Sequence, residues 1–340
     1  MTPTNASRSE PALAVRNLTT VFQTREGVLR AVDNLSFDVY PGECVGIVGE
    51  SGSGKSVASL SIMGLISYPG RVERGEVLFG GQDLLRLDDK HMRSIRGVHM
   101  GIIFQDPLTA LNPLFTVGRQ MTDVIRAHRK TSRREAAALA VEKLRLVGVS
   151  APESRLSAYP WELSGGLRQR VAIAMALLLD PHLIIADEPT TALDVSIQAQ
   201  ILELLRSLKN QLNFSLIFVS HDLGVIRSIA DRVVVMYAGH TLETGPVGEM
   251  FRRPWHPYTG ALLASAPTLA SDPGSPLPAI EGRLPSLSAL PGGCVFAPRC
   301  QFATPRCVAE RPALQSIGAV NRRVACFYPI GQPAKSEATR

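Results

Sequence analysis

The sequence predicts an α/β fold with a large domain over residues 1–250 and a proline-rich C-terminal extension over residues 251–340. Three observations predict it. A glycine-rich loop lies between a short apolar strand and a helical stretch at residues 44–66. Continuous apolar runs, typical of parallel strands buried on both faces, recur at 183–187 and 215–219, each after a helical segment. The extension then contains nine prolines before residue 300, with Ser and Gly between them, which predicts extended chain rather than a second α/β core.

The strands are predicted from runs of β-branched and aromatic residues and from their turn signals. We expect strands at residues 13–22, 35–40, 43–48, 76–80, 99–104, 183–187, 215–219 and 233–237. The first two belong to a hairpin-rich antiparallel subdomain. The last enters a hairpin through the turn Ala238-Gly239-His240.

Helical periodicity dominates from Asp106 to Val149, and we expect a helical subdomain at about residues 106–175. Ser132 and Glu135 have the spacing of a capping box, which predicts a helix that begins there and ends at Gly148.

Composition limits where the protein acts. The longest apolar run, Val171–Leu179, is far shorter than the ~20 residues that span a bilayer, and the first ten residues are polar. We therefore expect a cytoplasmic protein whose membrane role, if any, comes through partners. The net charge is +6, and much of the basic excess lies in the tail. The sequence has no basic strand interleaved with aromatic residues, the pattern that is typical of single-stranded nucleic-acid binding.

The glycine-rich loop fits the pattern G-x-x-x-x-G-K-[ST], which predicts a site for a nucleoside triphosphate such as ATP. Glycines let successive N–H groups turn inward towards phosphate oxygens, and the following helix N-terminus favours negative charge. Lysine in this pattern reaches the β- and γ-phosphates, and the last hydroxyl binds Mg²⁺. The predicted nucleotide-binding residues are Gly49, Ser51, Gly52, Ser53, Gly54, Lys55 and Ser56.

Two carboxylates follow the apolar strand 183–187 at its C-terminal end, the edge where ligands bind in α/β sheets. Asp187 is placed to hold Mg²⁺, and Glu188 to polarise an attacking water. A second helix start, Ser164-Gly165-Gly166, offers further exposed N–H groups for an anion. Because one chain has one triphosphate site, we expect this second start to serve the nucleotide of a neighbouring subunit.

These motifs, in this order, resemble an ATP-binding-cassette (ABC) ATPase, a P-loop NTPase with a RecA-like core, an antiparallel β subdomain and a helical insertion. Leu163-Ser164-Gly165-Gly166 matches the family signature, and Gln105, Asp194 and His221 match three further motifs of that family. The resemblance implies that Glu188 is the catalytic base, that His221 contacts the γ-phosphate, and that Gln105 senses Mg²⁺ and the attacking water. Phe22 is the aromatic residue expected to stack on adenine. Two such cassettes pair head to tail, with ATP between them.

Within the family, the chain looks like the D-type ATPase subunit of the dipeptide/oligopeptide importers. The matching residues are Glu50, Phe104-Gln105-Asp106-Pro107, Ala110-Leu111-Asn112-Pro113 and Trp255-His256-Pro257-Tyr258-Thr259, whereas Leu167 departs from the usual Gln or Met. The resemblance implies a subunit at the cytoplasmic face of the bacterial membrane that powers peptide import. Its implied partners are an F-type ATPase subunit in a heterodimer, two transmembrane permease subunits and an extracytoplasmic peptide-binding protein.

Two alternatives to peptide import remain open. The same machine could carry nickel, glutathione or antimicrobial peptides, because this subunit does not touch the cargo. A soluble cassette protein acting on ribosomes or DNA is the other; such proteins usually have two cassettes or a long coiled-coil insertion, and this chain has neither.

Four cysteines cluster in the extension, at Cys294, Cys300, Cys307 and Cys326. In a cytoplasmic chain four clustered thiols suggest a metal site more than disulfides. Their spacing matches neither the common zinc ribbons nor the common ferredoxins, so Zn²⁺, an iron–sulfur cluster and no metal all stay open. Resemblance to the D-type subunits favours a [4Fe–4S] cluster. Nearby arginines would offset its negative charge, and His256 is expected to pack rather than to bind metal; the arginines are Arg299, Arg306, Arg311, Arg322 and Arg323.

Overall fold

The computed structural model divides the chain into two compact units. The first unit comprises residues 1–14, 38–43 and 77–217, and the second comprises residues 15–37, 44–76 and 218–340. The structure describes residues 10–25, 27–191, 193–265, 279–317 and 321–331. Both units draw on the region 1–250, and the domain boundary expected at residue 250 stays a prediction.

The second unit contains an antiparallel sheet in the strand order β2-β1-β4. The strands are β1 (Leu13–Thr24), β2 (Gly27–Val39) and β4 (Gly70–Phe79). They are rich in Val, Thr and Phe, which favour a pleated, half-buried surface. β1 and β2 confirm the two predicted N-terminal strands, although each is longer than its sequence pattern. Gly75 in β4 lets the backbones approach, because a Cβ there would lie 2.6 Å from Leu18 Cα.

A second sheet in this unit has the order β12-β10-β9-β3. β3 (Cys44–Val48) pairs in parallel with β9 (Arg232–Tyr237), and β9 forms an antiparallel hairpin with β10 (His240–Pro246). The hairpin turns at Ala238 and Gly239, whose φ values of 47° and 82° are those of a tight two-residue turn. The predicted hairpin is therefore confirmed. The helices α1 (Lys55–Ile62), α9 (Leu223–Ile229) and α10 (Val247–Arg252) belong to this unit.

The extension is more ordered than its sequence predicts. It forms α11 (Pro257–Ser265), a short turn η3 (Ala297–Arg299), α12 (Pro305–Ala309), β11 (Gln315–Ser316) and β12 (Arg323–Val324). The expectation of an extended segment past Phe251 is wrong for α11, which begins with a proline and contains the good helix formers Ala261-Leu262-Leu263-Ala264. Strand β12 pairs with β10, placing Val324 opposite Glu243, a long-range contact that local sequence does not reveal. Four of the nine prolines, those within 266–278, lie outside the described residues.

In the first unit, β6 (Met100–Ile103) pairs in parallel with β7 (Leu183–Asp187), with Ile102 opposite Ile185. Both strands were predicted. Gly101 lets α7 (Gly165–Ala176) pack closely, because a Cβ at Gly101 would lie 2.6 Å from the Ala176 carbonyl oxygen. The longest helix here is α8 (Val195–Leu212), and β8 (Ser215–Ser220) follows it.

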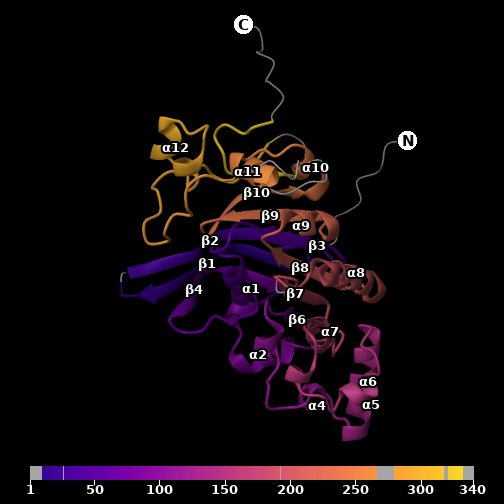
Figure 1. The fold of residues 1–340 in the computed structure, drawn as a ribbon. Helices are drawn as coiled ribbons and strands as arrows, with labels where there is room; N and C mark the ends of the chain where they lie inside the picture. Colours follow the sequence, from indigo (N-terminus) through magenta and orange to yellow (C-terminus); the bar gives the residue numbers. More distant parts are fainter. Residues whose placement is uncertain (1–9, 26, 192, 266–278, 318–320, 332–340) are drawn as a thin grey trace, which may run out of the picture. The chain divides into compact units, whose positions relative to one another are not determined.

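The predicted helical region of the first unit is confirmed. It holds α3 (Pro107–Ala110), α4 (Val117–His128), α5 (Arg133–Leu146), α6 (Pro152–Arg155) and the turn η2 (Pro160–Glu162). The hairpin strand β5 (Gln82–Asp83), the turn η1 (Leu84–Arg86) and α2 (Asp89–Ile95) precede it. α4 and α5 lie side by side (Figure 1).

The capping box at the start of α5 is formed as predicted. Glu135 N–H donates to Ser132 Oγ at 3.2 Å, and Ser132 N–H donates to Glu135 Oε2 at 2.8 Å. Gly148, with φ 73°, lies just after the helix end. Across the described residues, no helix combines the length and apolarity that crossing a bilayer requires.

Candidate functional site

The predicted phosphate loop joins β3 to α1 in the second unit. Gly49 and Gly54 are each required by close backbone packing, because a Cβ at Gly49 would lie 2.1 Å from the Met236 carbonyl oxygen and one at Gly54 would lie 2.3 Å from that of Ala31. Gly54 caps α1 with φ 98°, a conformation that favours glycine. The hairpin and β2 therefore hold the loop in one tight conformation.

Lys55 and the loop serines have the chemistry of an anion site. Lys55 is 4 % exposed, and its ammonium donates to the carbonyl oxygens of Gly49 at 2.9 Å and Glu50 at 3.0 Å. Ser53 Oγ is buried without a hydrogen-bond partner among the described residues, and Ser56 lies half-buried in the first turn of α1. A buried, unsatisfied hydroxyl beside a buried ammonium fits a ligand rich in acceptor oxygens, such as a triphosphate. Ser51 and Gly52 are exposed.

In the first unit, Asp187 and Glu188 lie at the C-terminal end of β7, 6 % and 9 % exposed. Gln105, just beyond β6, donates from Nε2 to Glu188 Oε2 at 3.1 Å. Thr191 Oγ1 donates to the same oxygen at 3.0 Å. The parallel pairing of β6 and β7 thus brings together two residues that the sequence singled out separately, and Thr191 adds a donor that the sequence did not single out as a ligand.

Glu188 has a left-handed backbone, with φ 46°. For a residue with a Cβ this conformation costs about 1–3 kcal/mol and persists only where surrounding structure imposes it. Its carboxylate is held by two side-chain donors, so both its backbone and its side chain are fixed. Strain of this kind concentrates at sites where the direction of one side chain matters.

The second predicted anion site also lies in the first unit. Ser164 caps α7 and accepts from Leu167 N–H at 3.4 Å, and Gly165 and Gly166 begin the helix. Asp194 caps α8 through its backbone and is exposed, followed by Val195 at 84 % exposure. Ala192, between Thr191 and Asp194 in the sequence, lies outside the described residues.

His221 and Phe22 belong to the second unit, with the phosphate loop. His221 is exposed and directly follows β8, where Asp222 caps α9 by accepting from Gly224 N–H at 2.7 Å. Phe22 is half-buried in β1 against Gly70, where a Cβ would lie 2.6 Å from the Phe22 ring. The second unit therefore collects the phosphate loop, His221 and Phe22, whereas the first collects Gln105, Asp187, Glu188, the Ser164 helix start and Asp194.

The four extension cysteines line one small apolar cavity of about 20 Å³, room for about one water molecule. A backbone hydrogen bond joins two of them: Cys294 N–H donates to the Cys307 carbonyl oxygen at 2.8 Å. Burial raises the pKa of Cys294 and Cys300, and it raises the pKa of Cys326 to about 12, with the other three cysteines adding to the rise. The described residues form no group of three or more His, Cys, Asp or Glu placed to hold a metal ion.

That the five arginines offset a charged cluster stays a prediction, and four of them contact other protein groups in the structure. Arg299 pairs with Glu50, Arg306 with Glu310 and Arg322 with Glu243. Arg323 donates to the Ser36 carbonyl oxygen at 3.2 Å. The charge of Arg311 only partly opposes the rise in the pKa of Cys294 that burial causes.

His256 packs as predicted. It is 1 % exposed, and its Nδ1 accepts from Tyr258 N–H at 3.0 Å. Burial lowers the pKa of His256 to about 3, which keeps the ring neutral. The ring also lines the cysteine cavity.

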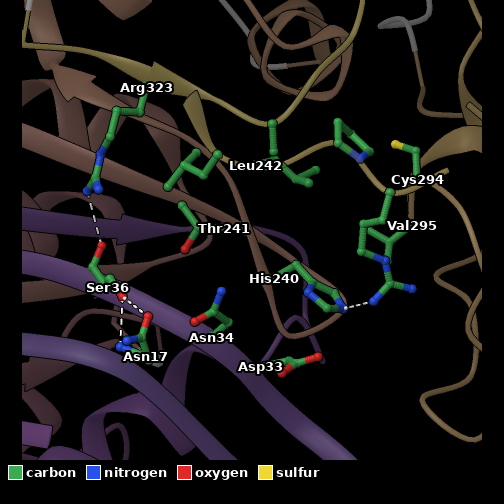
Figure 2. A pocket seen from close by; sticks show the side chains of 15 residues that line it. Asn17, Asp33, Asn34, Ser36, His240, Thr241, Leu242, Cys294, Val295 and Arg323 are labelled. Carbon is green, nitrogen blue, oxygen red and sulfur yellow. Dashed lines mark hydrogen bonds between the residues drawn. The ribbon is translucent and has the colours of Figure 1, made fainter. Parts of the chain in front are cut away.

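A second cavity, of about 480 Å³, lies in the second unit between β1, β2, β10 and the extension (Figure 2). His240 and Asp33 lie on one side of it, and Arg323 and Ser36 on the other. Arg311 donates to the Pro291 carbonyl oxygen at 2.6 Å and contacts His240 Nε2 at 3.3 Å. Burial and Arg311 lower the pKa of His240 to about 4, so the neutral ring accepts this bond. The cavity contains no predicted nucleotide-binding residue, and its cations are engaged by protein acceptors.

Two family models match the chain. The model for ABC transporters matches residues 32–191, and the model for the C-terminal region of oligopeptide/dipeptide transporters matches residues 242–307. The first match includes the phosphate loop, Gln105, the Ser164 helix start and the Asp187–Glu188 pair, and the second includes three of the four extension cysteines.

Similar proteins include two with names that state a transport role. The chain is 49 % identical over 321 residues to the dipeptide transport ATP-binding protein DppD of Escherichia coli, covering 94 % of this chain and 97 % of the relative. It is 53 % identical over 292 residues to the oligopeptide transport ATP-binding protein OppD of Bacillus subtilis, covering 86 % and 82 %.

Solved structures resemble the cassette part of the chain. The dimeric, post-hydrolysis structure of the ATP-binding cassette MJ0796 bound to ADP and phosphate has a TM-score of 0.62 at 30 % identity, covering 69 % of this chain and 98 % of that one. The cbiO1 protein of Clostridium perfringens, part of an ABC transporter complex, has a TM-score of 0.60 at 26 % identity, covering 72 % and 92 %.

Proposed function

Because the chain belongs to the ABC transporter family and is an ATPase of that family, we propose that it powers the import of dipeptides and oligopeptides across the bacterial cytoplasmic membrane. The observation that carries the catalytic part is the strained, doubly hydrogen-bonded Glu188 beside Asp187 at the end of β7. The phosphate loop, with buried Lys55 and unsatisfied Ser53, fits the triphosphate.

We propose a role for each of the site residues. Gly49, Ser51, Gly52, Ser53, Gly54, Lys55 and Ser56 bind the phosphates, and Phe22 contacts the base. Bound Mg·ATP supplies the electrophilic γ-phosphate. Mg²⁺ bound with the nucleotide would be held by the Ser56 hydroxyl, Asp187 and Gln105. Glu188 takes the proton of the attacking water, with its carboxylate aimed by Gln105 and Thr191, and His221 contacts the γ-phosphate.

The chain dimerises with a second cassette, which brings that cassette's motifs to each nucleotide. It also works with permease subunits. We propose that Ser164, Gly165, Gly166 and Asp194 contact the nucleotide of an F-type partner subunit in a head-to-tail heterodimer. Val195, which directly follows Asp194, is 84 % exposed and would be available for contact with that partner. An extracytoplasmic peptide-binding protein completes the proposed importer, and this subunit lies peripherally on the cytoplasmic face.

Peptide uptake tests the cargo. We expect cells or proteoliposomes with the complete importer to accumulate a labelled dipeptide only when ATP is supplied on the cytoplasmic side. Unlabelled di- and tripeptides should compete, whereas nickel and glutathione should not. ATP hydrolysis stimulated by nickel or glutathione, with no peptide uptake, would reject the peptide assignment and leave the ATPase in place.

We also propose that Cys294, Cys300, Cys307 and Cys326 hold a [4Fe–4S] cluster, with Zn²⁺ as the alternative. Four cysteines around one apolar cavity supply the number and type of ligand that such a cluster takes, although a cavity of about 20 Å³ would have to widen to admit it. Burial raises the pKa of Cys294, Cys300 and Cys326 and so favours their neutral thiols, and a bound metal centre would replace those protons. Zinc would need the four sulfurs to converge at about 2.3 Å from one ion.

Metal analysis of protein purified without oxygen decides between these outcomes. We expect about four iron and four sulfide per chain, as the cluster formula requires. Cys326→Ser should lower the iron content severalfold, whereas Cys44→Ser, in buried β3, should leave it unchanged. One zinc per chain would replace the cluster by the alternative, and the absence of both metals would reject the metal site.

A further inference from the structure

The extension contacts the phosphate loop through the loop residue Glu50. Its backbone N–H donates to the hydroxyl oxygen of Tyr258 in α11 at 2.9 Å. Its two carboxylate oxygens accept from Arg299 Nη1, in η3, at 3.0 and 2.9 Å. Both the main chain and the side chain of this loop residue are therefore fixed by the extension, from 208 and 249 residues away in sequence.

These contacts are largely shielded from water. Tyr258 is fully buried, the Arg299 side chain is 6 % exposed and that of Glu50 is 26 % exposed. Arg299 cannot swing away freely, because it also donates to the carbonyl oxygens of Glu281 at 2.9 Å and Ile280 at 3.1 Å. A fixed, desolvated guanidinium neutralises the Glu50 carboxylate far more effectively than an exposed one would.

Aromatic packing holds both contacts in place. The ring centroid of Tyr258 lies 4.7 Å from that of Tyr237 and 5.2 Å from that of Phe296. Phe296 directly precedes the turn that carries Arg299 and packs edge-on against Tyr237 at 5.3 Å. Tyr237 ends β9, the strand beside β3, so the extension is anchored to the strand next to the phosphate loop.

We propose that Arg299 and Tyr258 are positioning residues that set the affinity of the phosphate loop for ATP, which makes the C-terminal extension part of the nucleotide site. This inference rests on the proposed function, since it takes the loop to bind ATP. A triphosphate brings several negative charges to a loop that already contains the Glu50 carboxylate. Arg299 cancels that carboxylate, and Tyr258 fixes the direction of the Glu50 N–H.

A charge-rescue cycle tests the role of Arg299. ATP affinity with Mg²⁺ is measured by calorimetry on the full chain and on three variants, Arg299→Met, Glu50→Gln and the double variant. We expect Arg299→Met to weaken ATP binding about tenfold, because it leaves an uncancelled carboxylate in the loop. The double variant should return to within about threefold of the original chain, because that carboxylate is gone. Because removing Glu50 would also relieve a purely structural defect, the unfolding temperature of each nucleotide-free variant is measured beside its affinity. A loss of affinity without a matching loss of stability supports the positioning role, and a loss that follows the loss of stability would overturn it.

Two further variants keep the test decisive. Tyr258→Phe changes no charge and should raise the KM for ATP about threefold, with kcat within about twofold. Arg306→Gln removes an exposed pair with Glu310 in the same extension and should change neither constant. Tight ATP binding by Arg299→Met, or a double variant as weak as the single one, would overturn the inference. A failure of the unaltered chain to bind ATP would instead overturn the proposed function on which it rests.

Discussion

Replacing Glu188 by Gln is expected to lower the rate of ATP hydrolysis about 10²–10⁴-fold, the contribution of a positioned general base. The amide keeps the size of the carboxylate and an oxygen that can still accept from Gln105 and Thr191. It cannot take a proton from water at neutral pH. The loss should therefore appear in kcat, with ATP affinity within about threefold of the original, measured as phosphate release and nucleotide binding on the same protein.

Glu203→Gln provides the matched control, because Glu203 is an exposed acid of α8 that pairs with Arg206 one turn away. It should hydrolyse ATP at the original rate. A Glu188→Gln protein that keeps more than about a tenth of the original kcat would assign the base to another residue. In the complete importer, peptide uptake should fall with hydrolysis if the partner site does not suffice alone.

Replacing Arg322 by Met is expected to lower the free energy of unfolding by about 3–5 kcal/mol, the largest stability effect we predict. Glu243 in β10 is fully buried, and Arg322 is 2 % exposed and pairs with it. The backbone N–H groups of Trp255 and His256 each donate to the same carboxylate at 3.0 Å. Without Arg322, a buried carboxylate would keep those two bonds but lose its counter-charge. Chemical denaturation monitored by tryptophan fluorescence measures the change, since Trp255 lies under the Arg322 guanidinium at 4.0 Å.

A second replacement separates charge from packing. Glu243→Gln in the Arg322→Met background should recover a large part of the lost stability, because no buried charge then remains unpaired. Arg145→Gln, which breaks an exposed pair with Glu153, should cost less than about 1 kcal/mol. Equal losses from Arg322→Met and Arg145→Gln would show that the buried pair is not important for stability.

Much of the cassette could be predicted from the sequence because its signals are local. The loop pattern specifies the order strand, loop and helix, and the capping box at Ser132 and the turn at Gly239 each report a conformation that depends on a few adjacent residues. Asp187 and Glu188 could be placed at a sheet edge, because acids directly after an apolar run lie where a buried parallel strand ends. The comparisons confirm the family and the ATPase activity that these motifs implied.

The features that the sequence did not predict depend on contacts between residues that are far apart in the chain. Nothing near Thr191 marks it as a donor to Glu188, and the left-handed backbone of Glu188 has no sequence signal. The roles of Tyr258 and Arg299 were equally hidden, although Tyr258 belongs to a motif that the sequence did single out. Prolines in the extension suggested extended chain, but two helices and two short strands form, and β10 of the cassette pairs with one of these strands.

The pairing of β12 with β10 protects a sheet margin of the cassette before the cassette binds its partner subunits. A strand at the margin of a sheet presents unpaired N–H and C=O groups that can template pairing with another chain. β12 covers β10 at Glu243 and Thr244, and β11, only two residues long, ends the sheet beyond it. The extension thus covers the middle of the β10 margin and ends the sheet in a strand of only two residues, which limits misassembly. A chain truncated before residue 315 is expected to aggregate.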